Sequence, residues 1–220
     1  MLDRYLTIKG YGETEIEINR SRFICYVERA ETEEAAQAFI AGIKKKHWDA
    51  THNCSAYLIG ETDHIQKADD DGEPSGTAGK PILEVLKKNH LKDCVVVVTR
   101  YFGGIKLGAG GLIRAYGKGA SAALRAGQVI EQVLHDRLSF QMDYTFLGKI
   151  ENALRSQQEI ILEEIAYTDA VTVHVLVPKG KDSAVVEWIT DLTSGQAVLT
   201  KGDSLYVEFP FGKELQEEEA

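Results

Sequence analysis

Long apolar runs and cysteine are scarce in this sequence, and each scarcity excludes a class of protein. No apolar run approaches the ~20 residues that a membrane-spanning helix needs. Residues 1–12 lack the apolar core of a signal peptide. The three cysteines, Cys25, Cys54 and Cys94, are odd in number and far apart, which argues against a disulfide or zinc framework. The sequence therefore predicts a cytoplasmic protein whose cysteines are buried thiols.

Basic residues are scarce in the second half of the chain. Residues 1–134 hold 18 Lys and Arg and 18 Asp and Glu, whereas residues 135–220 hold 7 and 16, which accounts for the net charge of −9. A chain of 220 residues is long for one compact domain and comfortable for two. We therefore expect a neutral domain at 1–134 and an acidic domain at 135–220. The acidic half, including the tail 214–219, favours solubility, and so strongly acidic a chain is a poor general binder of polyanions.

Acidic residues are absent between Asp93 and Glu131, and glycines concentrate there. Residues 95–98 are β-branched and predict a buried strand, and residues 112–127 suit a helix. The five glycines between these two elements are Gly103, Gly104, Gly108, Gly110 and Gly111. The neighbouring basic residues are Arg100, Lys106, Arg114, Lys118 and Arg125. A glycine-rich turn before a helix start offers close backbone approach and free N–H groups. Residues 100–114, called the glycine segment here, are thus an expected anion site.

A purely structural interpretation of the glycine segment stays open, because five glycines also suit a tight turn and close packing of the helix on the sheet. Two named phosphate motifs are excluded. A Walker loop needs Gly-Lys followed by Ser or Thr, which no position supplies. A dinucleotide fingerprint needs G-x-G-x-x-G, and residues 108–113 break it at the last glycine.

An acidic stretch without apolar side chains, ADDDGEPSGTAGK at 68–80, is the second notable feature. Its composition predicts a mobile surface loop without helix or strand. The residues of interest are Asp70, Asp71, Glu73 and Ser75, with Asp69 beside them. Its carboxylates suit Mg²⁺ beside a bound phosphate, although the stretch fails the calcium-loop pattern. We assign no metal to it, and the mobile loop is the favoured interpretation.

The tripeptide His52-Asn53-Cys54 allows a Cys/His nucleophile pair in principle. Residues two apart on a strand point the same way without necessarily touching. A packed strand start is the favoured interpretation, because buried cysteines are commonly inert. No catalytic residue is assigned.

Periodicity predicts the remaining elements of the first half. Strands at 14–19 and 22–27 around a turn at 19–21 form a hairpin. A helix at 31–46 has Thr32 as its N-cap and three lysines at its end. A strand follows at 54–59, and Pro81 opens a further helix.

The second half alternates strands and helices. The expected order is strand 138–146, helix 147–158, strands 160–166 and 171–178, helix 182–193 and strand 205–209. This β-α-β-β-α-β order is the split βαβ, or ferredoxin-like, pattern. The half has no evident catalytic group, so we expect an interaction or docking module.

Two long motifs carry a resemblance. DDGEPSGTAGKPILEVL at 70–86 and VVVVTRYFGGIKLGAGGLIRAYG at 95–117, followed by the acidic βαββαβ half, resemble the IMPACT/YigZ family. The resemblance covers essentially the whole chain. It implies an α/β (α+β) protein: an N-terminal ribosomal protein S5 domain 2-like domain followed by a C-terminal ferredoxin-like domain. These folds also occur in the C-terminal domains of elongation factor G. Eukaryotic relatives regulate translation through protein partners, and the bacterial branch implies a translation-linked or nucleic-acid-associated role.

Two hypotheses of function follow. The favoured one is a non-enzymatic cytoplasmic factor that binds RNA or a ribosome-associated partner, without a cofactor. Arg100, Lys106 and Arg114 would contact phosphates, and Tyr101 and Phe102 would stack on bases. The alternative is an enzyme acting on a small phosphate ester or nucleotide held by the glycine segment, with a metal on the acidic loop. The sequence lacks a clear base paired with a nucleophile, which favours the first hypothesis.

Overall fold

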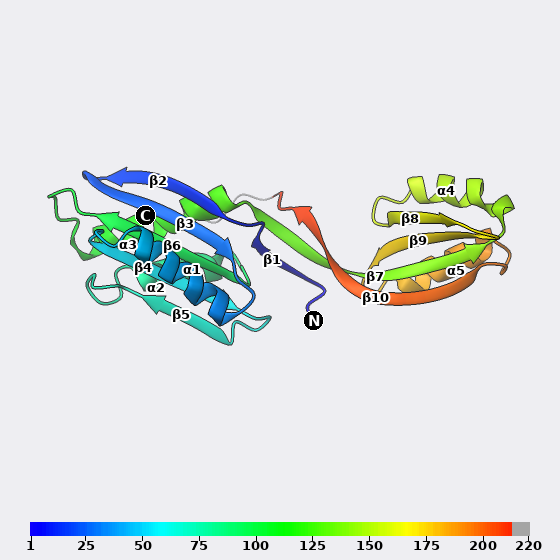
Figure 1. The fold of residues 1–220 in the computed structure, drawn as a ribbon, viewed down its shortest axis with the longest axis horizontal. Helices are drawn as coiled ribbons and strands as arrows, with labels where there is room; N and C mark the ends of the chain where they lie inside the picture. Colours follow the sequence, from blue (N-terminus) through cyan, green and yellow to red (C-terminus); the bar gives the residue numbers. More distant parts are fainter. Residues whose placement is uncertain (213–220) are drawn as a thin grey trace. The chain divides into compact units, whose positions relative to one another are not determined.

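The computed structural model describes residues 1–212, and these residues form two compact units (Figure 1). The first unit contains Tyr5–Glu131, together with Met1 and residues 209–212. The second contains Gln132–Glu208 and Leu2–Arg4. The boundary expected between residues 134 and 135 falls within strand β7 (Val129–Met142). The acidic tail at 214–219 lies outside the described residues.

The first unit is built on a five-stranded sheet in the order β2-β3-β6-β4-β5. Its strands are β2 (Gly12–Ile18), β3 (Ser21–Arg29), β4 (His52–Ile59), β5 (Ile65–Asp69) and β6 (Cys94–Tyr101). Neighbouring strands are antiparallel throughout. The predicted hairpin is confirmed: Ile18 pairs with Ser21, and Asn19 and Arg20 make the turn with φ of 48° and 63°.

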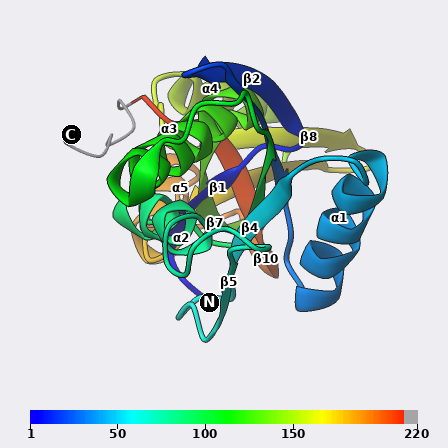
Figure 2. The ribbon, with the colours of Figure 1, turned by 90° about the vertical axis from the view of Figure 1, so that its left-hand side faces the viewer.

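Helices cover both faces of this sheet, as Figure 2 shows. Helix α1 (Glu33–Lys46) packs on one face, and α2 (Gly79–Lys88) and α3 (Gly108–Gly127) pack on the other. The alternation of strand side chains explains the division. Cys25, Cys54 and Val98 face α2 and α3, while Tyr26 and Val97 face α1. The predicted cap of α1 is confirmed, because the Thr32 side chain accepts a hydrogen bond from the Ala35 N–H.

Strand β1 (Arg4–Ile8) was not predicted, and β7 and β10 (Val198–Pro210) begin earlier than the sequence suggested, with residues 144–146 in a 3-10 turn and not in a strand. Two further differences bear on the site. Helix α3 begins at Gly108 and not at residue 112, so Gly110 and Gly111 lie in its first turn. Packing of Leu112 and Tyr116 against the sheet outweighs the low helix propensity of these glycines. Strand β5, which the polar sequence IQKAD does not reveal, pairs with β4 and ends inside the stretch expected to be irregular.

The second unit has the β-α-β-β-α-β order that the sequence predicted. After β7 come α4 (Leu147–Arg155), β8 (Ile161–Tyr167), β9 (Val171–Pro178), α5 (Asp182–Leu192) and β10 (Val198–Pro210). In the sheet β7 is flanked by β9 and β10, with β8 beyond β9, and β1 (Arg4–Ile8) also pairs with β7. The arrangement confirms the α/β class and the ferredoxin-like fold of this unit.

Within residues 1–212, no helix combines the length and the apolar character needed to cross a membrane.

Candidate functional site

Three stretches that the sequence singled out meet at one end of the first sheet, where β6 ends and the glycine segment begins. Strand register places Arg100 of β6 between Phe23 of β3 and His52 of β4. The acidic loop brings Glu73 to the same place, and α3 brings Tyr116.

Arg100 is the buried centre and not a surface contact. Only 5% of the residue is exposed. Its guanidinium lies 5.5 Å from the ring centroids of both Phe23 and Phe102, a cation–π geometry. Nη1 donates to Glu73 at 2.7 Å and Nη2 to Ser21 at 3.3 Å, while Nε has no partner among the described residues. Arg100 is therefore held by Glu73 and Ser21 against the rings of Phe23 and Phe102, and the phosphate contact that the sequence suggested for it stays a prediction.

Glu73 is the acidic loop's link to this centre. Its side chain is 3% exposed, and Oε1 accepts hydrogen bonds from Arg100 and, at 2.8 Å, from the Tyr116 hydroxyl. Oε2 lies 3.8 Å from His52 Nε2. A carboxylate and a guanidinium that are this deeply buried have little contact with water, so each needs the other as its charged partner. The ion pair therefore holds the acidic loop against β6.

The rest of the acidic loop is anchored as well. The Asp70 carboxylate accepts the backbone N–H groups of Gly76, Ala78 and Gly79 at 2.7, 3.0 and 2.8 Å. Asp71 accepts from Lys44 at 2.7 Å and from the Asn53 backbone at 2.6 Å. The sequence predicted only that no apolar side chain anchors this segment, and the structure shows that hydrogen bonds to its carboxylates hold it. Its mobility stays a prediction for hydrogen exchange to test.

A metal on the acidic loop has no ligand set in this structure. Among residues 1–212, no three His, Cys, Asp or Glu side chains are grouped so as to hold a metal ion. The carboxylates of Asp70, Asp71 and Glu73 are turned inward or paired, and Ser75 is exposed.

His52 and Cys54 do not form a nucleophile pair. His52 Nδ1 is bonded to the Asp71 carbonyl at 2.8 Å, and the Cys54 thiol points to the Asp70 carbonyl at 3.0 Å. Burial raises the pKa of the Cys54 thiol, and nearby carboxylates raise it further. A protonated, buried thiol is a poor nucleophile.

The glycines of the glycine segment divide into two groups. Gly103 is required by close packing, since a Cβ there would lie 1.9 Å from the Arg20 carbonyl oxygen. Gly104 and Gly108 have φ of +84° and +69°, which favour glycine. Gly110 has no such reason, because a Cβ there would meet only Arg114 Nη1 at 3.8 Å. The structural interpretation therefore explains part of the glycine content and leaves Gly110 unexplained.

The start of α3 is exposed and positively charged. Leu107, at the N-cap, makes no side-chain capping bond, and the first turn holds no acidic residue. The same contact near Gly110 shows that the Arg114 guanidinium lies back over this first turn. Lys106 and Arg114 are exposed, and neither makes an ion pair within residues 1–212. A cation beside the positive end of a helix dipole is unfavourable unless an anion joins them.

The two aromatic residues of the glycine segment differ in exposure. Tyr101 is half-buried, and its hydroxyl is bonded to His47 Nδ1 at 2.9 Å and to Asp49 at 3.1 Å. Phe102 is 47% exposed, with one face toward the Arg100 guanidinium. Of the two rings, Phe102 is the one available to a ligand.

Sequence reasoning missed two parts of this surface. The β2–β3 turn at Arg20 packs against Gly103. The loop between α1 and β4, which carries Trp48, is hydrogen-bonded to the segment through Thr51. A tryptophan in a polar connection, at HWDAT, was the signal available for the second part.

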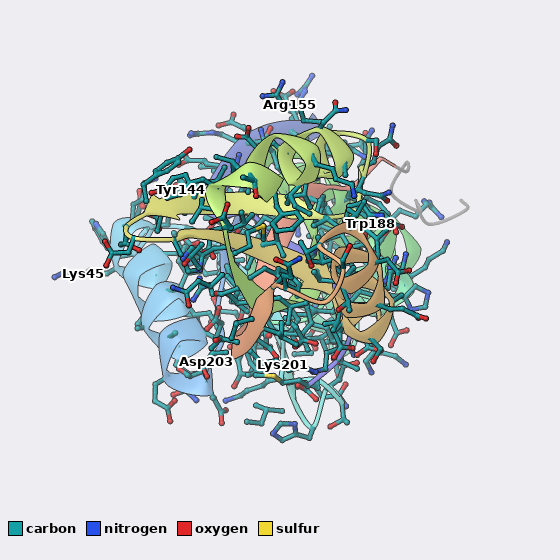
Figure 3. All side chains as sticks on the ribbon, turned by 90° about the vertical axis from the view of Figure 1, so that its right-hand side faces the viewer. Lys45, Tyr144, Arg155, Trp188, Lys201 and Asp203 are labelled. Carbon is teal, nitrogen blue, oxygen red and sulfur yellow. The ribbon has the colours of Figure 1, made fainter. Side chains whose placement is uncertain are left out.

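The second unit contains a cavity of about 220 Å³ between α5 and the end of β9. Its apolar lining comes from Val177, Val185 and Trp188. The lining also includes the ion pair between Glu159 and Lys181. Figure 3 labels Trp188 on α5. The lining of this cavity is therefore mostly apolar, with one ion pair.

Comparison with known proteins identifies the two domains of this chain. The model of the Impact N-terminal domain matches residues 19–124, and a model described as a domain of unknown function (DUF1949) matches residues 140–196. A crystal structure of a hypothetical protein is similar with a TM-score of 0.58 and 33% identity, over 90% of this chain and 97% of that one. Fold and domain order thus define a two-domain protein with an Impact N-terminal domain.

Full-length relatives make the assignment specific. IMPACT family member YvyE of Bacillus subtilis is 57% identical over 208 residues, covering 94% of this chain and 95% of the relative. IMPACT family member YigZ of Escherichia coli is 37% identical, covering 83% and 90%. The chain belongs to the IMPACT family, as the two sequence motifs suggested. Protein IMPACT homolog of Dictyostelium discoideum is 36% identical over 40% of this chain and 26% of that protein.

Proposed function

We propose that the protein is a non-enzymatic cytoplasmic factor linked to translation, and that its glycine segment binds single-stranded RNA, free or exposed on a ribosome-associated surface. The translation link comes from the family resemblance, and the binding mode comes from the site. The observation that carries the proposal is the start of α3, where Lys106 and Arg114 are exposed and unpaired among the described residues beside an uncapped helix end.

Phosphate groups suit this arrangement better than carboxylates of a folded partner do. A phosphodiester is a permanent anion, and it can accept from the first-turn N–H groups and from Arg114 together. Gly110 leaves the backbone open for such an approach. The exposed ring of Phe102 adds a stacking surface, which is how proteins hold unpaired bases.

Direct RNA binding tests the proposal. Fluorescence anisotropy of a labelled oligouridylate should show saturable binding to the full chain, weakened by Lys106→Ala and by Arg114→Ala. Lys87→Ala is the matched control, because this lysine lies in the last turn of α2 and is also exposed. Removing a phosphate contact should weaken binding similarly for all RNA sequences.

The enzyme alternative predicts a different result. The wild-type protein would then show no RNA binding. A nucleotide or sugar phosphate would raise the melting temperature of wild type but not that of Arg114→Ala. That pattern would contradict the proposed function.

A further inference from the structure

Trp48 is a large apolar side chain with no packing role, since it is 83% exposed. It lies in the connection between α1 and β4, and neither hypothesis drawn from the sequence used it. An indole left this open in water costs free energy that a binding partner recovers.

The loop that carries Trp48 is tied to the glycine segment by three hydrogen bonds. The Thr51 N–H donates to the Arg100 carbonyl at 2.9 Å, and the Phe102 N–H donates to Thr51 Oγ1 at 3.0 Å. The Tyr101 hydroxyl donates to Asp49 Oδ1 at 3.1 Å. Asp49 and Thr51, which follow Trp48 in the loop, are therefore both hydrogen-bonded to the glycine segment.

His47 fixes the loop on the other side of Trp48. Its ring lies between two phenols, with Nε2 at 2.6 Å from the Tyr26 hydroxyl and Nδ1 at 2.9 Å from the Tyr101 hydroxyl. Its carbonyl accepts from the Asn53 side chain at 3.2 Å. With both neighbours held, the backbone of Trp48 is fixed before any ligand arrives, so binding costs little ordering entropy.

Charges around this loop favour an anionic ligand. On the adjoining strand β2, Glu13 is paired with Lys46 and Glu15 with Arg22. Glu17 of β2 and Asp49 beside Trp48 make no ion pair within residues 1–212. Arg20, whose carbonyl packs against Gly103, makes no ion pair within residues 1–212. Lys106 and Lys45 are likewise unpaired there, so the unpaired cations around this loop outnumber the unpaired carboxylates.

We infer that Trp48 is a second base-stacking residue, and that single-stranded RNA runs across this end of the first sheet from Phe102 to Trp48. The inference rests on the proposed function and extends it, because it adds the α1–β4 loop to the binding surface. RNA is favoured over a protein partner because Phe102 and Trp48 are exposed rings on two segments joined by hydrogen bonds, and because unpaired cations outnumber unpaired carboxylates around them.

Trp48 reports on its own contacts. The chain has two tryptophans, and Trp188→Phe in the second unit leaves Trp48 as the sole indole emitter. Titration of this full-length variant with oligouridylate should quench the emission in parallel with the anisotropy signal, because a stacked base quenches an indole. Trp48→Ala should weaken binding ~5- to 150-fold, the loss expected for one stacked base. Trp48→Phe should restore part of the affinity, and neither change should alter the salt slope or the melting temperature.

Three outcomes overturn the inference, and they are distinguishable. If RNA binds while Trp48 emission and the affinity of Trp48→Ala stay unchanged, Trp48 is outside the site and the proposed function stands. If wild type binds no RNA, the proposed function fails and takes the inference with it. If oligouridylate has no effect on Trp48 but a ribosomal protein fraction changes its emission, this surface binds protein.

Discussion

Removal of the Glu73 carboxylate should destabilise the first unit strongly. Glu73 is the hydrogen-bonded counterion of Arg100, and both side chains are nearly inaccessible to water, at 3% and 6% exposure. Glu73→Ala leaves a buried guanidinium without a counterion, and breaking such a pair from one side costs about 3–5 kcal/mol. The Tyr116 hydroxyl loses its acceptor in the same variant.

Urea denaturation of the full chain, followed by circular dichroism, measures this loss as a lower midpoint of the first unit's transition. Glu84→Ala is the control, because Glu84 is exposed on α2 and should change stability by no more than about 0.5 kcal/mol. The double variant Glu73→Leu/Arg100→Leu removes both charges and should be more stable than Glu73→Ala. A loss below about 1 kcal/mol in Glu73→Ala would refute the buried ion pair as the anchor of the acidic loop.

Three further predictions follow from single contacts. Gly110→Ala should raise the melting temperature slightly, because alanine is the better helix former and only Arg114 is near, yet it should weaken RNA binding; unchanged affinity would mean that the backbone there is not approached. Burial, reinforced by the charge of Lys46, lowers the pKa of His47, so the unfolded chain binds the proton more readily and stability should fall as pH drops below about 6.5. Urea denaturation above and below that pH should show that the free energy of unfolding depends less on pH in His47→Gln than in wild type. An equal pH dependence in the two proteins would exclude His47 as the titrating group. Burial raises the pKa of the Cys25 thiol to about 12 and raises those of the other two cysteines, so iodoacetamide should label none of the three until denaturant is added.

Local patterns in the sequence predicted the local structure. Asn19 and Arg20 between two alternating runs gave the hairpin, and Thr32 before an apolar periodicity gave the cap of α1. The β-α-β-β-α-β order of the second unit followed in the same way, since each element shows its own period. The start of α3 was placed four residues late because glycine propensity is local, whereas packing of Tyr116 on the sheet is not.

Contacts between distant segments could not be predicted in this way. Composition marked the acidic stretch as a loop, but which carboxylate turns inward depends on Arg100, 27 residues further along the chain. Trp48 was missed for a related reason: a single aromatic residue in a connection has no period, and its exposure depends on how α1 and β4 are joined. The binding roles of Phe102, Lys106 and Arg114 remain predictions.

The salt dependence of RNA affinity tests the central claim most directly, because each phosphate contact contributes to the slope of log K against log salt. Lys106→Ala and Arg114→Ala should each reduce that slope by about 0.7 to 1, the change for one single-strand phosphate contact. Lys87→Ala should leave it unchanged. Equal slopes in wild type and in both glycine-segment variants would contradict the claim that this segment holds RNA phosphates.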